Sequence, residues 1–458
     1  MPVTLRDRLA QFAPDLPLLH TVDGPLTTSD LMASSPGPSH PISGGALLIG
    51  CSDLALALRT ILQFEGGLDR MGFCAPTLGT KQKDDLARAG EFDAALLDPG
   101  ETLAQCPSFN SLPALETYLG THFSAGLSSP RPTEWVMTTS GTTGVPKLVT
   151  HSLDSLTVST KTATQPAVNI RWGMVYDYTR FAGMQVVMQS LMSGACLLCP
   201  NLMASLSEQL AFLTAQRATH LSATPTLWRK ILMTPRHQAL APEVITLGGE
   251  IVDQLVLDQL AKTYPRAKCI HIFASTEAGV GFTVRDGLAG FPETYLDDSP
   301  AGIDLRIVED QLEVHNSRVH SAYLGEQGAI TDSEGWVATG DLVAQRAGRI
   351  VFLGRANGTI NVGGNKVMPE VVEAALMAHP RVVFARAFEK RSAFMGALVG
   401  CEVVLDQPIP ANRPEDKKVL IGQITAFASE RLEAYQTPAL VKVVDKIATN
   451  AAGKLMRR

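Results

Sequence analysis

The 458-residue chain has no apolar run long enough to cross a membrane as a helix, and its first residues do not resemble a secretory signal. It also lacks an excess of positive charge, because 39 Lys and Arg residues stand against 45 Asp and Glu residues, a formal net charge of −6. No basic field is therefore available to collect a phosphate backbone. We expect no membrane span and no nucleic-acid partner.

Cysteine is scarce, with seven residues scattered along the chain. An odd and dispersed set does not form a disulfide framework, so we expect free thiols and a cytoplasmic location. Cys196 and Cys199 have a spacing seen in zinc sites, but they lie in an apolar stretch with no second Cys or His pair. We interpret that stretch as a buried strand.

The residues that are present favour a globular enzyme, since 45% are hydrophobic and 18% are charged. Between about residues 45 and 280, short apolar runs alternate with segments of helical period. Strands are expected at 46–50, 94–98, 194–200, 218–225, 243–249 and 269–276, and helices at 54–63, 205–217 and 253–262. This alternation predicts an α/β fold with parallel sheets covered by helices.

The pattern changes after residue 300. Short strands with polar turns predict a small antiparallel or β-barrel-like unit. The glycine-rich stretch 354–366 is expected to interrupt regular structure as a linker. A helix starting at Pro369, a second helix near 421–433 and three apolar strands then predict a small α+β unit. We therefore predict a large domain over 1–355 and a small one over 356–458.

The segment TTSGTTGVPK, from Thr138 to Lys147, directly follows an apolar run. Its glycines let backbone amides converge, its hydroxyls add donors, and Lys147 adds positive charge, so it is typical of a phosphate-binding loop. It is not a Walker loop, because no Ser or Thr follows the lysine. The alternative is a hydroxyl-rich surface loop.

With this loop, the chain resembles the adenylate-forming superfamily, which includes acyl-CoA synthetases, fatty and aryl acyl-AMP ligases, adenylation domains of peptide synthetases, and beetle luciferases. The resemblance implies a large domain of two parallel, helix-flanked sheets plus a β-barrel-like unit, followed by a mobile α+β domain. It also implies that the loop binds the phosphates of ATP. The residues carried over for that role are Thr139, Ser140, Gly141, Thr142, Thr143, Gly144 and Lys147.

Two later segments extend the resemblance to the adenine and the metal. The segment LGGE implies an adenine contact from Gly248, Gly249 and Glu250. In HIFASTEAG, the family pattern implies that an aromatic ring stacks on adenine, that a threonine touches the α-phosphate, and that a glutamate holds Mg²⁺. The matching residues are Phe273 with Ala274, then Thr276, and Glu277. Phe273 replaces the usual tyrosine and lacks its hydroxyl.

The remaining segments concern the ribose, the hinge and catalysis. The resemblance implies that Asp341 accepts hydrogen bonds from the ribose hydroxyls and that Arg355 contacts ribose or phosphate. It places the hinge at Asn357, beside Gly358, and the path of the thiol at Gly363 and Gly364. It also implies that Lys454 bridges the substrate carboxylate and the α-phosphate during adenylation.

The implied reaction uses ATP and Mg²⁺ to convert a small carboxylic acid to its acyl-AMP, followed by transfer to the thiol of CoA. An acyl-AMP ligase that loads the phosphopantetheine of an acyl or peptidyl carrier protein is one alternative. A non-catalytic nucleotide-binding protein and a luciferase-like oxygenase are two more. The identity of the acid and the formation of a homodimer are left open.

The acyl-binding region departs from the family. Where many relatives have a His followed by a Gly, this chain has Arg180 and Gly183. Arg180 could recognise a second polar group on the acid, or it could pair with Asp177. Phe181 and Met184 are the other candidates for the acyl pocket.

Overall fold

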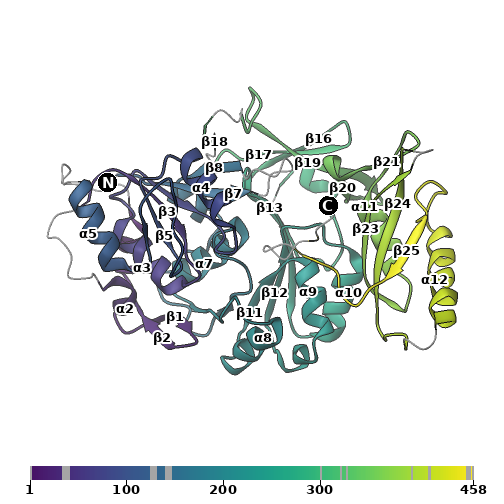
Figure 1. Ribbon diagram of the computed structural model, residues 1–458, viewed down its shortest axis with the longest axis horizontal. Helices are drawn as coiled ribbons and strands as arrows, with labels where there is room; N and C mark the ends of the chain where they lie inside the picture. Colours follow the sequence, from purple (N-terminus) through teal and green to yellow (C-terminus); the bar gives the residue numbers. More distant parts are fainter. Residues whose placement is uncertain are drawn as a thin grey trace.

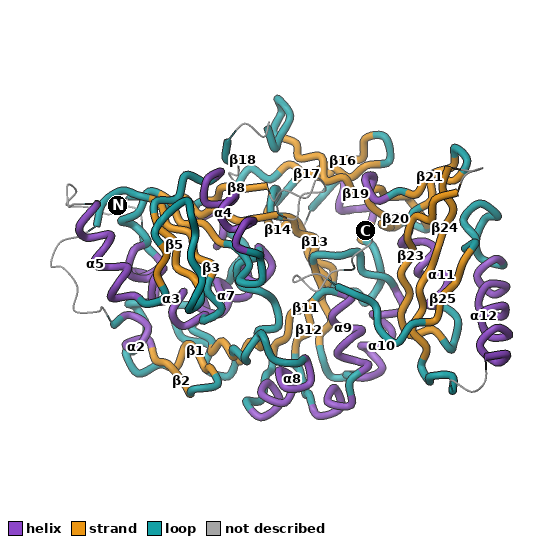
Figure 2. The backbone as a smooth tube through the Cα atoms, viewed as in Figure 1, coloured by secondary structure: helices purple, strands orange, loops and turns teal. Residues whose placement is uncertain are grey.

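The computed structural model describes residues 3–33, 42–123, 131–139, 147–299, 302–319, 322–325, 329–392, 396–410, 414–449 and 455. Across these ranges the strands form five sheets, whose arrangement is seen in Figures 1 and 2. None of the helices in these ranges is long and apolar enough to cross a bilayer.

The first sheet has the order β18-β8-β7-β4-β3-β5-β6. Its central strands β3, β4, β5, β6 and β7 run parallel, and β8 and β18 are antiparallel at one edge. The bounds are β3 Ala46–Gly50, β4 Arg70–Phe73, β5 Ala94–Leu97, β6 Ser108–Phe109, β7 Glu134–Thr139, β8 Lys147–His151 and β18 Ala322–Tyr323. All five residues of β3 are buried, because helices cover both faces.

The helices around this sheet are α1 Leu5–Leu9, α2 Thr28–Met32, α3 Leu54–Phe64, α4 Thr80–Ala89, α5 Leu112–His122 and α6 Leu153–Thr157. Helix α3 begins where Asp53 accepts hydrogen bonds from the amides of Ala55 and Leu56, which satisfies donors that have no partner within the helix. Its buried face includes Leu58 and Ile61.

The second sheet has the order β14-β13-β12-β11-β9-β10-β1-β2 and is parallel except at its two edges. Its strands are β1 Pro17–Thr21, β2 Gly24–Thr27, β9 Arg171–Gly173, β10 Cys196–Leu198, β11 His220–Ala223, β12 Val244–Gly248, β13 Lys268–Ser275 and β14 Gly279–Val284. Helices α7 Phe181–Ser193, α8 Leu206–Ala215, α9 Pro225–Met233 and α10 Gln254–Thr263 connect them, with a short helix η1 Pro235–Ala239. The predicted α/β fold with helix-flanked parallel sheets is confirmed.

The third sheet, in the order β15-β20-β19-β17-β16, is antiparallel throughout. It consists of β15 Phe291–Pro292, β16 Asp304–Val308, β17 Gln311–His315, β19 Trp336–Arg346 and β20 Arg349–Arg355, with η2 Glu293–Leu296 between β15 and β16. This sheet is the unit predicted from the short strands after residue 300. A short helix, η3 Ala356–Gly358, follows it.

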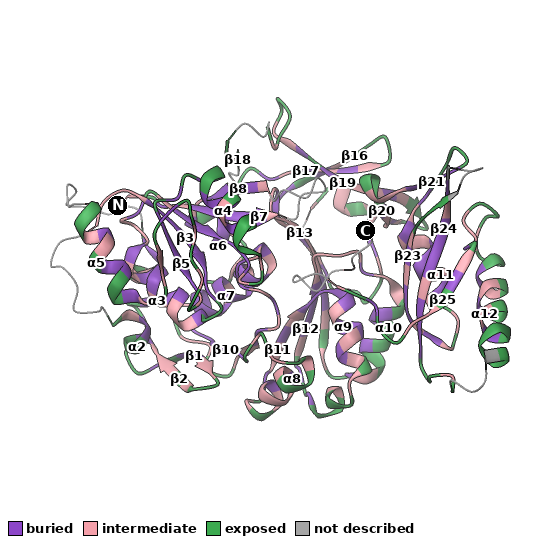
Figure 3. Ribbon diagram, viewed as in Figure 1, coloured by how far each residue is buried: buried purple, intermediate pink, exposed green. Residues whose placement is uncertain are grey.

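The carboxyl-terminal unit contains β21 Ile360–Val362, β22 Asn365–Val367, α11 Pro369–Met377, β23 Val382–Ser392, β24 Gly396–Leu405, α12 Pro414–Ser429 and β25 Leu440–Val443. Its buried residues from Ile360 onward form their own cluster, visible at the right of Figure 3. The expectation that 354–366 lacks regular structure is wrong. Gly363 (φ 57°) and Gly364 (φ 91°) form the tight turn of the β21–β22 hairpin, which two left-handed residues allow.

Candidate active site

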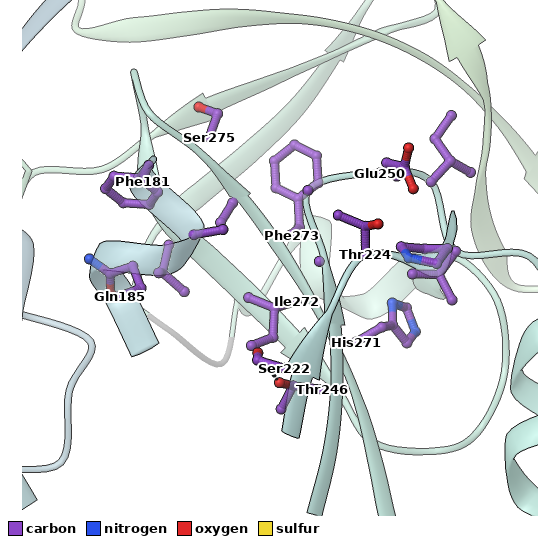
Figure 4. Close-up of a pocket in the computed structure, with 18 of the residues that line it drawn as sticks. Phe181, Gln185, Ser222, Thr224, Thr246, Glu250, His271, Ile272, Phe273 and Ser275 are labelled. Carbon is purple, nitrogen blue, oxygen red and sulfur yellow. Dashed lines mark hydrogen bonds between the residues drawn. The ribbon is translucent and has the colours of Figure 1, made fainter. Parts of the chain in front are cut away.

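A cleft of about 1820 Å³ lies at the centre of the molecule, and part of its wall is drawn in Figure 4. It is lined by the carboxyl end of β7, the start of α7, the ends of β11, β12 and β13, and parts of β19, β20 and α11. Open parallel sheets bind ligands at the carboxyl ends of their strands. We call this space the central cleft, its side toward Lys147 and Asp341 the nucleotide end, and its side toward α7 and the face of β11–β13 the acid end.

The residues at the two ends of the predicted phosphate loop, Thr139 and Lys147, lie next to each other at the cleft. Thr139 ends β7 and pairs with Lys147 at the start of β8, and both residues line the cleft. The loop residues Ser140, Gly141, Thr142, Thr143 and Gly144 lie outside the described residues. The Lys147 ammonium donates to the Tyr323 hydroxyl at 3.3 Å and lies 4.4 Å from the ring centroid. Tyr323, which the sequence did not point to, orients this lysine.

The glycines of the LGGE segment end strand β12. Gly248 and Gly249 line the cleft, and Gly249 has a φ of 78° that favours glycine. The Glu250 carboxylate accepts from the backbone amide of Thr226 at 3.0 Å and from that of Leu455 at 3.2 Å. Both of its oxygens are therefore engaged by the protein. An adenine at this segment would meet mainly its backbone.

Phe273 lies at the cleft within an aromatic stack. Its ring is nearly parallel to those of Phe282 and Phe352, with centroids 5.1 and 5.5 Å away. The Phe273 ring therefore already stacks on two aromatic rings of the protein. Phe273 and Ala274 still line the cleft, and Figure 4 shows the Phe273 ring beside Glu250.

Thr276 and Glu277 lie in the turn between β13 and β14, half-buried at the cleft. His151, at the end of β8, supports this turn from behind. Burial lowers the pKa of His151 to about 4, and the backbone of Thr276 acts in the opposite direction. The imidazole is therefore neutral at pH 7, 3.3 Å from the Ser155 hydroxyl and 5.6 Å from the Phe181 ring. Sequence reasoning missed this histidine.

Strand pairing brings together Asp341 and Arg355, which were predicted from separate motifs. They are direct partners on β19 and β20, and their side chains form an ion pair at 3.2 Å. Arg355 also donates to the carbonyl of Thr339 at 2.5 Å. The Asp341 side chain is only 16% exposed, so it presents a fixed pair of acceptor oxygens to the cleft.

The described part of the chain holds no group of three or more His, Cys, Asp and Glu residues that could bind a metal ion. Glu277, which lines the cleft, is therefore not part of such a group. Mg²⁺ is commonly bound by one or two carboxylates together with substrate phosphates and water. This donor set fits a magnesium ion that arrives with ATP.

Helix α7 forms one wall of the acid end. Arg180 and Phe181 line the cleft as predicted, but Gly183 and Met184 do not. Met184 is fully buried in the core, and a Cβ on Gly183 would lie 2.1 Å from the carbonyl oxygen of Asp177. Gly183 therefore allows the helix to pack closely against the preceding loop. The prediction of these two residues as pocket walls is wrong.

Within the described ranges, Arg180 and Asp177 form no ion pair, so that alternative is also wrong. Arg180 donates to the carbonyl and the hydroxyl of Thr138, at 3.3 and 3.2 Å. Asp177 accepts from the backbone and hydroxyl of Thr179 instead. Arg180 thus connects the start of α7 to Thr138, the residue before Thr139 at the beginning of the phosphate loop.

The opposite wall of the acid end is the face of β11, β12 and β13. The register places Ser222, Thr246 and Ile270 in one row across these strands, and all three line the cleft. The Ser222 and Thr246 hydroxyls are hydrogen-bonded to each other, as the dashed line in Figure 4 shows. Because one proton lies between them, the pair has a second proton to donate.

Gln185 lies on the same side of α7 as Phe181 (Figure 4), and both residues line the cleft. Its amide nitrogen donates to the Leu156 carbonyl at 2.8 Å and its oxygen accepts from Ser159 at 3.1 Å. The amide group is therefore held in one orientation. The Ser222 and Thr246 hydroxyls add two neutral polar groups to a wall that also contains Ile270, and no sequence motif indicated them.

Of the remaining predicted residues, Asn357 lines the cleft, whereas Gly363 and Gly364 do not. Lys454 lies outside the described residues, although its neighbour Leu455 lines the cleft. Asn357 is in η3 and also lines the cleft. Gly363 and Gly364 are exposed at the hairpin turn and do not line it. Their predicted role in the path of the thiol stays a prediction.

Comparison with known proteins shows the family to which the sequence is similar. The family model described as "AMP-binding enzyme" matches residues 93–339, more than half of the chain. The 2-succinylbenzoate–CoA ligase of Bacillus subtilis is 26% identical over 350 residues, covering 71% of this chain and 68% of that protein. The mitochondrial acyl-coenzyme A synthetase ACSM4 of Rattus norvegicus is 25% identical over 346 residues, covering 70% and 59%.

Solved structures share the fold. The anthranilate CoA ligase AuaEII in complex with anthranoyl-AMP superposes with a TM-score of 0.79 at 16% identity, covering 99% of this chain and 96% of that one. The o-succinylbenzoate coenzyme A synthetase of Bacillus subtilis, in complex with ATP and magnesium ion, has a TM-score of 0.71 at 20% identity, covering 99% and 98%.

Proposed function

This chain belongs to the AMP-binding enzyme family, and on that premise we propose that it uses ATP to activate a carboxylic acid as its acyl-AMP and then transfers the acyl group to the thiol of CoA. It is an AMP-forming acid–thiol ligase. The observation that carries the proposal is that Lys147, Glu277, Asp341 and Arg355, from four separate segments, meet in one cleft.

In the first half-reaction, a carboxylate oxygen of the acid attacks the α-phosphorus of ATP, and the bond from that phosphorus to pyrophosphate breaks. The two reactants are both anions, so cations and hydrogen-bond donors at the cleft must offset the charge that builds. Lys147 lies where it can face the departing pyrophosphate. Asp341 would hold the ribose, and Thr276 the α-phosphate.

Glu277 would hold the Mg²⁺ that accompanies ATP, and the ion would supply charge neutralisation on the phosphate oxygens. The place of Glu277 in the cleft wall, on the turn between β13 and β14, supports that role. Lys454 would stabilise the approach of carboxylate to α-phosphate, as its position next to Leu455 in the chain allows.

In the second half-reaction, the sulfur of CoA attacks the acyl carbon, the bond to AMP breaks, and the thiol proton is lost. The acyl-AMP must be shielded from water until then. We propose free CoA as the acceptor; phosphopantetheine on a carrier protein is the alternative, and thioester assays with each thiol distinguish them. All seven cysteines are free, which supports a cytoplasmic location.

The body of the acid would lie between α7 and the face of β11–β13. A plain alkyl chain there would cover the Ser222–Thr246 pair and leave its second hydroxyl proton without an acceptor, which is unfavourable. An acid with a neutral hydroxyl, keto or amide group away from its carboxylate would provide one. We therefore propose such acids as the substrate class to search first.

The test is ATP–pyrophosphate exchange with the purified protein over a panel of carboxylic acids, in which each hydroxylated acid is matched by its plain analogue. Acid-dependent exchange is expected, followed by thioester formation when CoA is added. No exchange with any member of a broad panel would contradict the proposal.

A further inference from the structure

We propose that Lys230 and Glu250 are positioning residues, which hold the carboxyl-terminal segment against helix α9 so that Lys454 is available for adenylation. The proposal rests on the function proposed above. No motif gives Lys230 a role, and for Glu250 the LGGE segment implies only an adenine contact. The two side chains act through Thr449 and Leu455, the described residues on either side of the segment that carries Lys454.

The first contact joins α9 to Thr449. The Lys230 ammonium donates to the Thr449 hydroxyl at 2.6 Å, across 219 residues of chain. Both side chains are half-buried. Burial lowers the pKa of Lys230, and the charge of the Glu250 carboxylate acts in the opposite direction. Figure 1 shows the chain after β25, in yellow, running back toward α9.

The second contact joins β12 to Leu455. Glu250 accepts from the backbone amide of Leu455 at 3.2 Å with one oxygen, and from the Thr226 amide in the first turn of α9 at 3.0 Å with the other. The carboxylate is thus fixed by the helix and in turn fixes the tail. Hydrogen bonds to an ionised acceptor are among the stronger ones in proteins.

The two contacts hold residues that are themselves paired, Thr449 and Leu455. Thr449 and Leu455 are paired as an isolated antiparallel bridge, so the segment between them starts and ends at one place. Leu455 also packs against Phe384, Val404 and Ile447 of the carboxyl-terminal unit. Lys230 and Glu250 therefore anchor both ends of this segment on the wall of the cleft.

Such anchoring matters because the lysine must meet two anions in a defined geometry. Holding a reacting group in place removes the entropy cost of positioning it during the reaction. A freely moving tail would place the Lys454 ammonium between carboxylate and phosphate for only a fraction of the time. Anchoring should thus raise the rate of the first half-reaction and leave the second unaffected.

The kinetic experiment compares Lys230→Met and Thr449→Val with Lys262→Met, which removes an exposed lysine from α10. We expect pyrophosphate exchange to fall about tenfold in the first two variants, from the loss of a charged hydrogen bond. Thioester formation from synthetic acyl-AMP should be unchanged. The double variant should be no slower than either single one, because both remove the same contact. Lys230→Arg should recover part of the rate.

A second experiment needs no activity. In hydrogen–deuterium exchange, the peptide that contains Leu455 should be protected in the unmodified protein and in Lys262→Met. It should exchange faster in Glu250→Gln and Lys230→Met. Equal protection in all four proteins, or equal loss of both half-reactions in Lys230→Met, would overturn the proposal. Absence of pyrophosphate exchange in the unmodified protein together with the expected protection pattern would instead count against the proposed function alone.

Discussion

The nucleotide end and the acid end of the central cleft are built differently. At the nucleotide end, Lys147, Asp341 and Arg355 are charged; Lys147 starts β8, Arg355 ends β20, and Asp341 lies within β19 as the partner of Arg355. At the acid end, Ser222 and Thr246 are neutral and lie within strands, across the cleft from the first turns of α7. Charged groups suit a ligand of fixed charge such as ATP. Side chains on rigid elements form a shaped pocket whose selectivity depends on fit.

Because the two ends differ in this way, substitutions at each end should affect catalysis differently. A change at the nucleotide end should affect every acid equally, because ATP is common to all reactions. A change at the acid end should alter the ratio between acids and leave the use of ATP intact. The following four changes test this division, from the largest expected effect to the smallest.

Lys454→Ala should have the largest effect. Loss of a cation that stabilises charge in the transition state commonly lowers the rate by about 10²–10³. We expect pyrophosphate exchange to fall by that order with every acid tested, while thioester formation from synthetic acyl-AMP continues. Equal loss of both half-reactions would show that the lysine has no special role in adenylation.

Asp341→Ala should weaken ATP binding. Removal of a charged acceptor from a hydrogen-bonded site is worth about 1.5–3 kcal/mol, or roughly 10- to 150-fold. The KM for ATP should rise by about that factor, and the KM for the acid should stay the same. Asp258→Ala, which changes an exposed acid on α10, is the control. An altered ratio between acids would break the division between the two ends.

Gly183→Ala tests how closely helix α7 packs at the acid end, through the free energy of unfolding of the protein. The added Cβ would lie 2.1 Å from the Asp177 carbonyl oxygen, so helix α7 must shift, at a cost of about 1–3 kcal/mol. Urea unfolding should show this loss. Gly422→Ala is a matched control in α12, where a Cβ would meet nothing within 4 Å. That variant should gain up to about 1 kcal/mol, because alanine favours a helix.

Much of the fold followed from the sequence because it depends on local patterns. The run at 46–50 is β3 with the same bounds, and α3 and α10 lie within one residue of their expected ends. The hairpin at Gly363 and Gly364 was missed, although two glycines between short β-branched runs are a turn signal. The helix expected near 421–433 begins earlier, at Pro414, where proline fits the first turn.

The nucleotide end was also largely predictable, since each of its motifs is a short continuous stretch. The side chain of Glu250 was not, because its partner Leu455 is 205 residues away. The acid end was mispredicted in part because α7 is apolar on almost every side, so its sequence does not tell which face is the core. Phe181 and Gln185 face the cleft, while Met184 faces the interior.

Ser222→Ala combined with Thr246→Val should have the smallest effect on the reaction rate and the clearest effect on selectivity between acids. Both changes keep the approximate shape of the row and remove its hydroxyls, and the register keeps the two positions adjacent. A neutral hydrogen bond is worth about 0.5–1.5 kcal/mol, so the preference for a hydroxylated acid over its plain analogue should fall by roughly 2- to 13-fold. The KM for ATP should not change. An unchanged preference with a lower rate for all acids would mean that the row supports the sheet and does not contact the substrate.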